Sequence, residues 1–206
     1  MRQMESQGRQ PSGRGNRNSG KLNPAKAGDS GPVALSRVPD LVQTGLNILF
    51  IGINPGLRSG ETGNHFAGRS NRFWRFLYES GLTPIKYQAD EGLRLLDLGY
   101  GITNIVPRVT ATAAELTPAE LREGAERLRL VLREQRPKIV AYLGKVVYQY
   151  VSGRPQSSWG RQAEPVIEGI VDFVMPNPSG LNRMPLSEQL ELYRELHDFV
   201  KAFSGE

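Results

Sequence analysis

Two short loops rich in asparagine, proline and glycine carry the residues best suited to chemistry. The first reads Gly52-Ile-Asn-Pro-Gly56 and the second Met175-Pro-Asn-Pro-Ser-Gly-Leu-Asn-Arg183, and each follows an apolar run. Proline fixes the backbone and glycine allows close approach, so such loops are stiff and can present main-chain groups to a ligand. Either loop alone is typical of an ordinary strand-to-helix turn. Two such loops, both at the carboxyl ends of parallel strands, indicate a binding site.

A third segment mixes basic, aromatic and amide side chains between Gly60 and Trp74. Such a mixture suits stacking on a nucleic-acid base while a phosphate is held nearby. Phe66, flanked by small residues, is the candidate stacking platform, and its alternative role is that of a core aromatic. His65 lies in the same glycine-rich stretch and is a candidate ligand contact. Trp74 falls in a helical apolar pattern and is expected in the core.

Several common chemistries lack the residues they need. There is no cysteine and there are only two histidines, His65 and His197, so thiolate sites and a multi-histidine metal centre are excluded. His197 has acidic neighbours and is expected at the surface. Neither a G-x-G-x-x-G loop nor a Walker A lysine loop follows the first apolar run, and Ser179 is not in a G-x-S-x-G elbow. We therefore expect no metal and no cofactor.

One carboxylate has two interpretations. Asp97 lies in Leu95-Leu-Asp-Leu-Gly-Tyr100, just before an apolar run. Near the site it could act as an accessory base. The alternative is an aspartate that ends a helix or forms a turn, as aspartates commonly do.

Strands and helices alternate along the chain. Apolar runs predict strands at 47–53, 101–106, 138–143 and 171–175, and periodic segments predict helices at 71–78, 90–96, 117–135, 144–151 and 186–203. Asn71 is the expected N-cap of the first helix, and Thr117-Pro-Ala-Glu120 is a capping box. The alternation predicts an α/β fold, a three-layer α/β/α sandwich with a short, mostly parallel central sheet and its site at the carboxyl ends of the strands.

Most of the positive charge lies in the first part of the chain. Residues 1–32 carry a net +4 of the formal +5, and they contain almost no apolar side chains. Such a segment cannot offset its ordering entropy, so we expect a disordered basic tail at 1–32, a lead-in at 33–46 and one domain at 47–206. The tail is either an arm that holds polyanions or a solubilising extension.

Nothing in the sequence suggests a membrane or an export route. No stretch approaches the ~18 apolar residues that a span needs, and the N-terminus has no apolar signal core. We expect a cytoplasmic monomer.

Together these motifs resemble the mismatch-specific uracil-DNA and thymine-DNA glycosylases, and the second loop resembles their bacterial, uracil-preferring branch. The resemblance covers roughly residues 47–203. It rests on 52–56 with Gly63, Phe66 and 71–74, on 177–183, and on the intervening Gly101-Ile-Thr-Asn104, Arg108 and Leu143-Gly-Lys145. Asn182 stands where the family has a serine.

The resemblance implies hydrolysis of the N-glycosidic bond of uracil, and more weakly of thymine or other modified pyrimidines, mispaired with guanine in double-stranded DNA. In a bacterium the protein would be associated with the nucleoid. The resemblance implies that Asn54 positions the attacking water. Ile53, His65, Phe66 and Asn104 form the base pocket. Gly180, Leu181 and Arg183 act as the wedge and contact the unpaired guanine. The candidates for DNA-backbone contacts are Arg69, Arg72, Thr110 and Lys145.

Two alternatives remain open at this point. One is a glycosylase for another lesion, such as a deaminated purine or an etheno adduct. The other is a non-enzymatic module that flips and holds a base, because an amide such as that of Asn54 can bind without catalysing.

Overall fold

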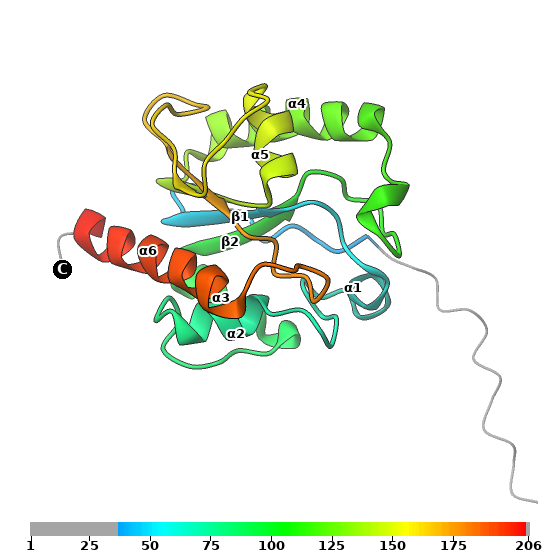
Figure 1. Ribbon diagram of the computed structural model, residues 1–206, viewed down its shortest axis with the longest axis horizontal. Coiled ribbons are helices and arrows are strands. Elements are labelled where there is room, and N and C mark those ends of the chain that lie inside the picture. The colour runs from blue at the N-terminus through cyan, green and yellow to red at the C-terminus, as the bar shows by residue number, and fades with distance from the viewer. Residues whose placement is uncertain (1–36, 205–206) are drawn as a thin grey trace, which may run out of the picture. The chain divides into compact units, whose positions relative to one another are not determined.

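The central element is one sheet, whose carboxyl edge will carry the site. The computed structural model describes residues 37–204, and these contain a five-stranded sheet in the order β2-β1-β3-β5-β4 (Figure 1). Four strands are parallel: β1 (Ile48–Gly52), β2 (Tyr100–Asn104), β3 (Ile139–Leu143) and β5 (Val171–Met175). The short β4 (Gly160–Arg161), which the sequence did not predict, runs antiparallel beside β5.

The parallel strands are almost fully buried, and their side chains are mostly apolar, because both faces of the sheet are covered. Leu49 and Ile51 of β1 face one core cluster, while Ile48 and Phe50 face the other. This alternation follows from the two-residue period of a strand. The first cluster is closed by α4 (Pro118–Gln135) and α5 (Lys145–Ser152), and the second by α2 (Phe73–Glu79), α3 (Arg94–Asp97) and α6 (Leu186–Ser204). The predicted α/β fold with a mostly parallel sheet is therefore confirmed, with helices on both faces (Figure 1).

Local sequence signals account for most helix ends. Thr117 accepts the Glu120 amide and completes the expected capping box of α4. At α2 the N-cap is Arg72, one residue after the predicted Asn71, but the Asn71 side chain still accepts the Phe73 amide at 2.9 Å and so satisfies an amide at the start of the helix. The predicted 90–96 helix is divided into a 3₁₀ turn, η1 (Ala89–Glu91), and α3. A second 3₁₀ turn, η2 (Ala113–Glu115), precedes α4.

A short helix, α1 (Leu57–Thr62), occupies a stretch that reads as a loop. Its Gly60 lies so close to Val109 that an added Cβ would fall 2.7 Å from the valine side chain. The glycine therefore serves close packing of α1 on the chain that follows β2.

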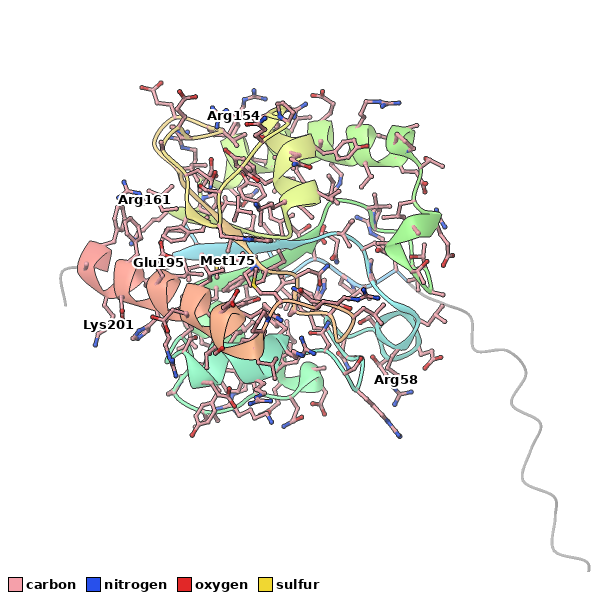
Figure 2. The ribbon with its side chains drawn as sticks, viewed as in Figure 1. Arg58, Arg154, Arg161, Met175, Glu195 and Lys201 are labelled. Carbon is pink, nitrogen blue, oxygen red and sulfur yellow. The ribbon has the colours of Figure 1, made fainter. Side chains whose placement is uncertain are left out.

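Residues 37–46 pack on this domain. Val38 and Leu46 are buried, Leu41 forms an antiparallel bridge with Ile102, and the Pro39 carbonyl lies 2.9 Å from His65 Nε2. At the far edge, Arg161 of β4 lies over the Phe199 ring of α6, 4.8 Å from its centre (Figure 2).

The tail predicted for residues 1–32 lies outside the described residues. Within 37–204, no helix has the length and apolar character that crossing a membrane requires.

Candidate active site

A pocket of about 830 Å³ opens where the four parallel strands end. Its walls come from the segments after β1, β2, β3 and β5. The chain leaves β1 toward α1 and α2 on one side of the sheet and leaves the neighbouring β3 toward α5 on the other. Such a point, where adjacent connections diverge, is the usual ligand crevice of an open parallel sheet. Both asparagine-rich loops line it.

The amide of Asn54 is held in one orientation. Its Nδ2 donates to Thr110 Oγ1 at 2.7 Å and to the Arg108 carbonyl at 3.3 Å. The Thr110 hydroxyl donates its own proton to the Thr112 carbonyl at 2.8 Å, so it can only accept from Asn54. Both nitrogen protons of Asn54 are thereby occupied. Its carbonyl oxygen is left to accept a proton from a molecule in the pocket.

Phe66 has a strained backbone and a supported ring. Its φ is 54°, a left-handed value that costs a bulky residue about 1–2 kcal/mol. Ser59 Oγ accepts the Ala67 amide at 3.2 Å, and Trp74 Nε1 donates to the His65 carbonyl at 3.3 Å, so both flanking peptides are anchored. The ring stacks on Phe73 with centroids 4.1 Å apart and also lines the pocket. Strain maintained in this way is typical of functional positions.

His65 and Asn104 form a buried polar pair behind Phe66. His65 Nε2 lies 2.9 Å from the Pro39 carbonyl, which can only accept, so Nε2 carries the proton. The bare Nδ1 then faces Asn104 Nδ2 at 3.5 Å. Burial lowers the His65 pKa, so the ring is neutral and is not a proton donor to the pocket.

The orientation of Asn104 follows from this pair. Its Oδ1 lies over Gly52, where an added Cβ would be only 2.5 Å away. Glycine at this position therefore allows the Asn104 carbonyl to sit at the pocket wall.

The second loop is held by its own polar groups. Asn177 Oδ1 accepts the Ser179 amide and Ser179 Oγ accepts the Leu181 amide. Asn182 donates from its side-chain amide to the Asn177 carbonyl at 2.8 Å. Leu181 is 83% exposed at the pocket rim beside Gly180.

The candidate backbone-contact residues occupy different environments. Lys145 lines the pocket with its ammonium 4.7 Å from the centre of the Trp159 ring. Thr110 is buried and holds Asn54. Arg69 is exposed and does not line the pocket, and the same holds for Arg183, the predicted contact to the unpaired guanine. The guanidinium of Arg72 donates to two carbonyls of the second loop, at 3.4 Å each.

The structure does not bring Asp97 to the pocket. Asp97 is exposed at the end of α3, just before the first residue of β2, whereas the pocket lies at the opposite end of that strand. Five residues of β2 separate these ends, a length of about 16 Å. The accessory role is therefore unsupported by the geometry, and Asp97 takes the position of a helix-end residue.

Three further pocket residues were missed by the sequence reasoning. Trp159 lies in the loop before β4, where no motif marks it. Ser59 and Asn177 fix loop backbones, Asn177 from within the second loop and Ser59 from a position just before the Gly60–Trp74 segment. Ser59 and Asn177 lie inside or beside the two motifs, so a systematic search for amide-capping side chains could have found them.

The charge around the pocket is positive. Among the described residues that line it, Arg58 and Lys145 are charged and none is acidic. Arg58, on α1, points outward and pairs with Glu61 (Figure 2). Across residues 37–204 no cluster of three or more His, Cys, Asp or Glu side chains could hold a metal ion. The described lining thus offers an oriented amide, an aromatic platform and a nearby cation.

A comparison with protein families agrees with this site. The family model described as the uracil DNA glycosylase superfamily matches residues 39–201, which include both loops and every strand.

Proposed function

The chain belongs to the uracil DNA glycosylase superfamily, whose members are DNA-repair hydrolases acting on uracil-type lesions, and from that premise we propose that it removes uracil mispaired with guanine from double-stranded DNA. The bond broken is the N-glycosidic bond between the base and C1′ of its deoxyribose. Thymine and other modified pyrimidines opposite guanine are slower substrates. The reaction is a hydrolysis without a covalent enzyme intermediate, since no lysine stands at position 54.

The observation that carries this proposal is the locked amide of Asn54. Because Thr110 and the Arg108 carbonyl occupy its nitrogen, its oxygen is available to accept a hydrogen bond from a water molecule. The water oxygen bonds to C1′ as the C1′–N1 bond breaks. The bonding pair leaves on N1 of the base, and the proton of the water passes to solvent.

An amide orients a water but does not deprotonate it, so the chemistry depends on the leaving group. No carboxylate lines the described pocket, and His65 is neutral with both ring nitrogens engaged. The transition state therefore has oxocarbenium character, with charge on the sugar and on the departing base. Uracil loses its N1 proton more readily than thymine and lacks the methyl group, which explains the preference.

The base must leave the helix to reach this pocket. Phe66, supported by Phe73, provides the stacking surface, and main-chain groups near Ile53 and Phe66 bind the edge of the base. The Asn104 carbonyl, fixed by His65, is suited to accept the N3–H of uracil. Lys145 is suited to hold a phosphate next to the flipped nucleotide.

Leu181 fills the gap that the base leaves. An exposed leucine on a stiff loop can enter the stack and offset part of the cost of extrusion, which is a few kcal/mol. Gly180 and Arg183 contact the unpaired guanine. A G·U or G·T wobble pair opens more easily than a matched pair, so the mismatch preference follows from the flipping step.

A nicking assay tests the proposal. A labelled duplex with one G·U pair is incubated with the wild-type protein and then treated with alkali, which cleaves at an abasic site. Cleavage at the uracil supports the proposed function. Cleavage only of duplexes carrying hypoxanthine or an ethenobase supports another lesion range, and tight binding without cleavage supports a non-enzymatic lesion binder.

A further inference from the structure

Arg72 supplies hydrogen-bond donors to three alternate carbonyls of the second loop. Its backbone amide donates to the Pro178 carbonyl at 2.8 Å. Its guanidinium donates through Nη2 to the Gly180 carbonyl and through Nη1 to the Asn182 carbonyl, both at 3.4 Å. Leu181, the proposed wedge, lies between the last two of these carbonyls.

The loop's internal hydrogen bonds use two other carbonyls, those of Asn177 and Ser179. The Asn182 side chain donates to the Asn177 carbonyl, and the Asn182 amide donates to the Ser179 carbonyl at 3.0 Å. The carbonyls of residues 178, 180 and 182 take no part in these internal bonds, and Arg72 donates to all three. One residue outside the loop thus supplies three of its hydrogen bonds.

Arg72 is itself rigidly placed. It is the N-cap residue of α2, where its carbonyl accepts the Phe76 amide at 2.8 Å. The neighbouring Ser70 packs against Gly180 so closely that a Cβ added to the glycine would lie 2.5 Å from Ser70 Cβ. The loop is therefore seated on the start of α2 by close packing as well as by hydrogen bonds.

We propose that Arg72 is a positioning residue that holds residues 177–183 in the shape that projects Leu181. The proposal rests on the proposed function, because the wedge matters only where a base is flipped from duplex DNA. The guanidinium suits the task because its fork presents donors in fixed directions, whereas the lysine ammonium is a point charge on a flexible stem. A positive charge alone would be enough to contact a phosphate. It would not be enough to clamp the loop, that is, to hold residues 177–183 through several directed hydrogen bonds.

Arg72→Lys therefore separates the two roles. We expect it to lower the single-turnover rate on a G·U duplex by about 10-fold or more, because lysine keeps the charge but not the fork. The matched control is Arg75→Lys, an identical exchange one turn along α2 at an exposed arginine that pairs with Glu79. The control is expected to match the wild type.

A double-mutant cycle with Leu181→Ala asks whether Arg72 acts through the wedge. If it does, Arg72→Lys costs little further rate once Leu181 is truncated. Losses that multiply in the double variant overturn the proposal and indicate a general structural role. Full activity of Arg72→Lys, with loss and a shallower salt dependence in Arg72→Gln, also overturns it and indicates a phosphate contact.

Hydrogen exchange of the free protein tests the clamp without reference to activity. Amides of residues 179–184 are expected to exchange faster in Arg72→Lys than in wild type or Arg75→Lys, with unchanged exchange in β1 and β3. Unchanged loop exchange overturns the clamp. A wild-type protein that releases no uracil overturns the proposed function alone, since the exchange result still decides whether Arg72 holds the loop.

Discussion

Leu181→Ala should weaken uracil release from duplex DNA without weakening the fold. Leucine has three more carbons than alanine, and each buried carbon contributes about 0.8 kcal/mol, so a wedge that is fully buried in the stack loses about 2.4 kcal/mol. That corresponds to a rate lower by about 60-fold. In the free protein Leu181 is 83% exposed, so its truncation should change the free energy of unfolding by no more than about 0.5 kcal/mol.

The loss should depend on how hard the target base is to extrude. It should be largest for uracil paired with adenine, intermediate for uracil opposite guanine, and smallest for uracil in a single strand, where there is no stack to fill. The assay is single-turnover base release on each of the three substrates that the wild type cuts, with a melting curve for the variant.

Two results would refute this reasoning. Equal fractional losses on the three substrates with a lowered melting temperature would show that Leu181 supports the loop and is not a wedge. An unchanged rate on the G·U duplex would show that no side chain at this position enters the stack.

The other predictions concern separate parts of the molecule. Thr110→Val, which keeps the shape but frees the Asn54 amide, should slow single-turnover release by about 10-fold with little change in DNA affinity, measured by titration. Lys145→Gln should make the log K versus log salt slope shallower by about 0.9, the value for one phosphate contact. Burial raises the pKa of Asp172 from 3.8 to about 6, although Tyr142 donates to it, so the folded state favours the protonated acid. The unfolding free energy of the wild type relative to Asp172→Asn should therefore fall by about 3 kcal/mol as pH rises from about 3 to about 7, as urea titrations at several pH values would show.

The sequence predicts the sheet well because its signals are local. Each long strand is a mostly apolar run covered on both faces. Thr117 with Glu120 marks the start of α4 within four residues. Helix α1 was not predicted, because Gly60 interrupts its helical pattern. The reason for a glycine there is the contact with Val109, which is distant in the sequence. The two-residue β4 has no pattern of its own.

Some residues of the site could be predicted from local sequence motifs, and others could be found only from the fold. Asn54, Phe66 and Leu181 could be selected from their motifs, and the structure places all three around one pocket. The roles of Arg72 and Trp159 could not, because Arg72 binds carbonyls 108 and 110 positions away and Trp159 meets Lys145 only through the fold. Asp97 shows the converse: nearness in sequence to a strand does not show which end of that strand carries the site.

The most direct test of the account compares uracil release from a G·U duplex by the wild type and by Asn54→Ala under single-turnover conditions. The wild type should release the base, and the variant should be slower by at least about 100-fold while binding the duplex with similar affinity, because the substitution removes the water-orienting amide but leaves the proposed duplex contacts of the second loop in place. A variant rate within about threefold of the wild type, a difference below 1 kcal/mol, would contradict the central claim that Asn54 positions the attacking water.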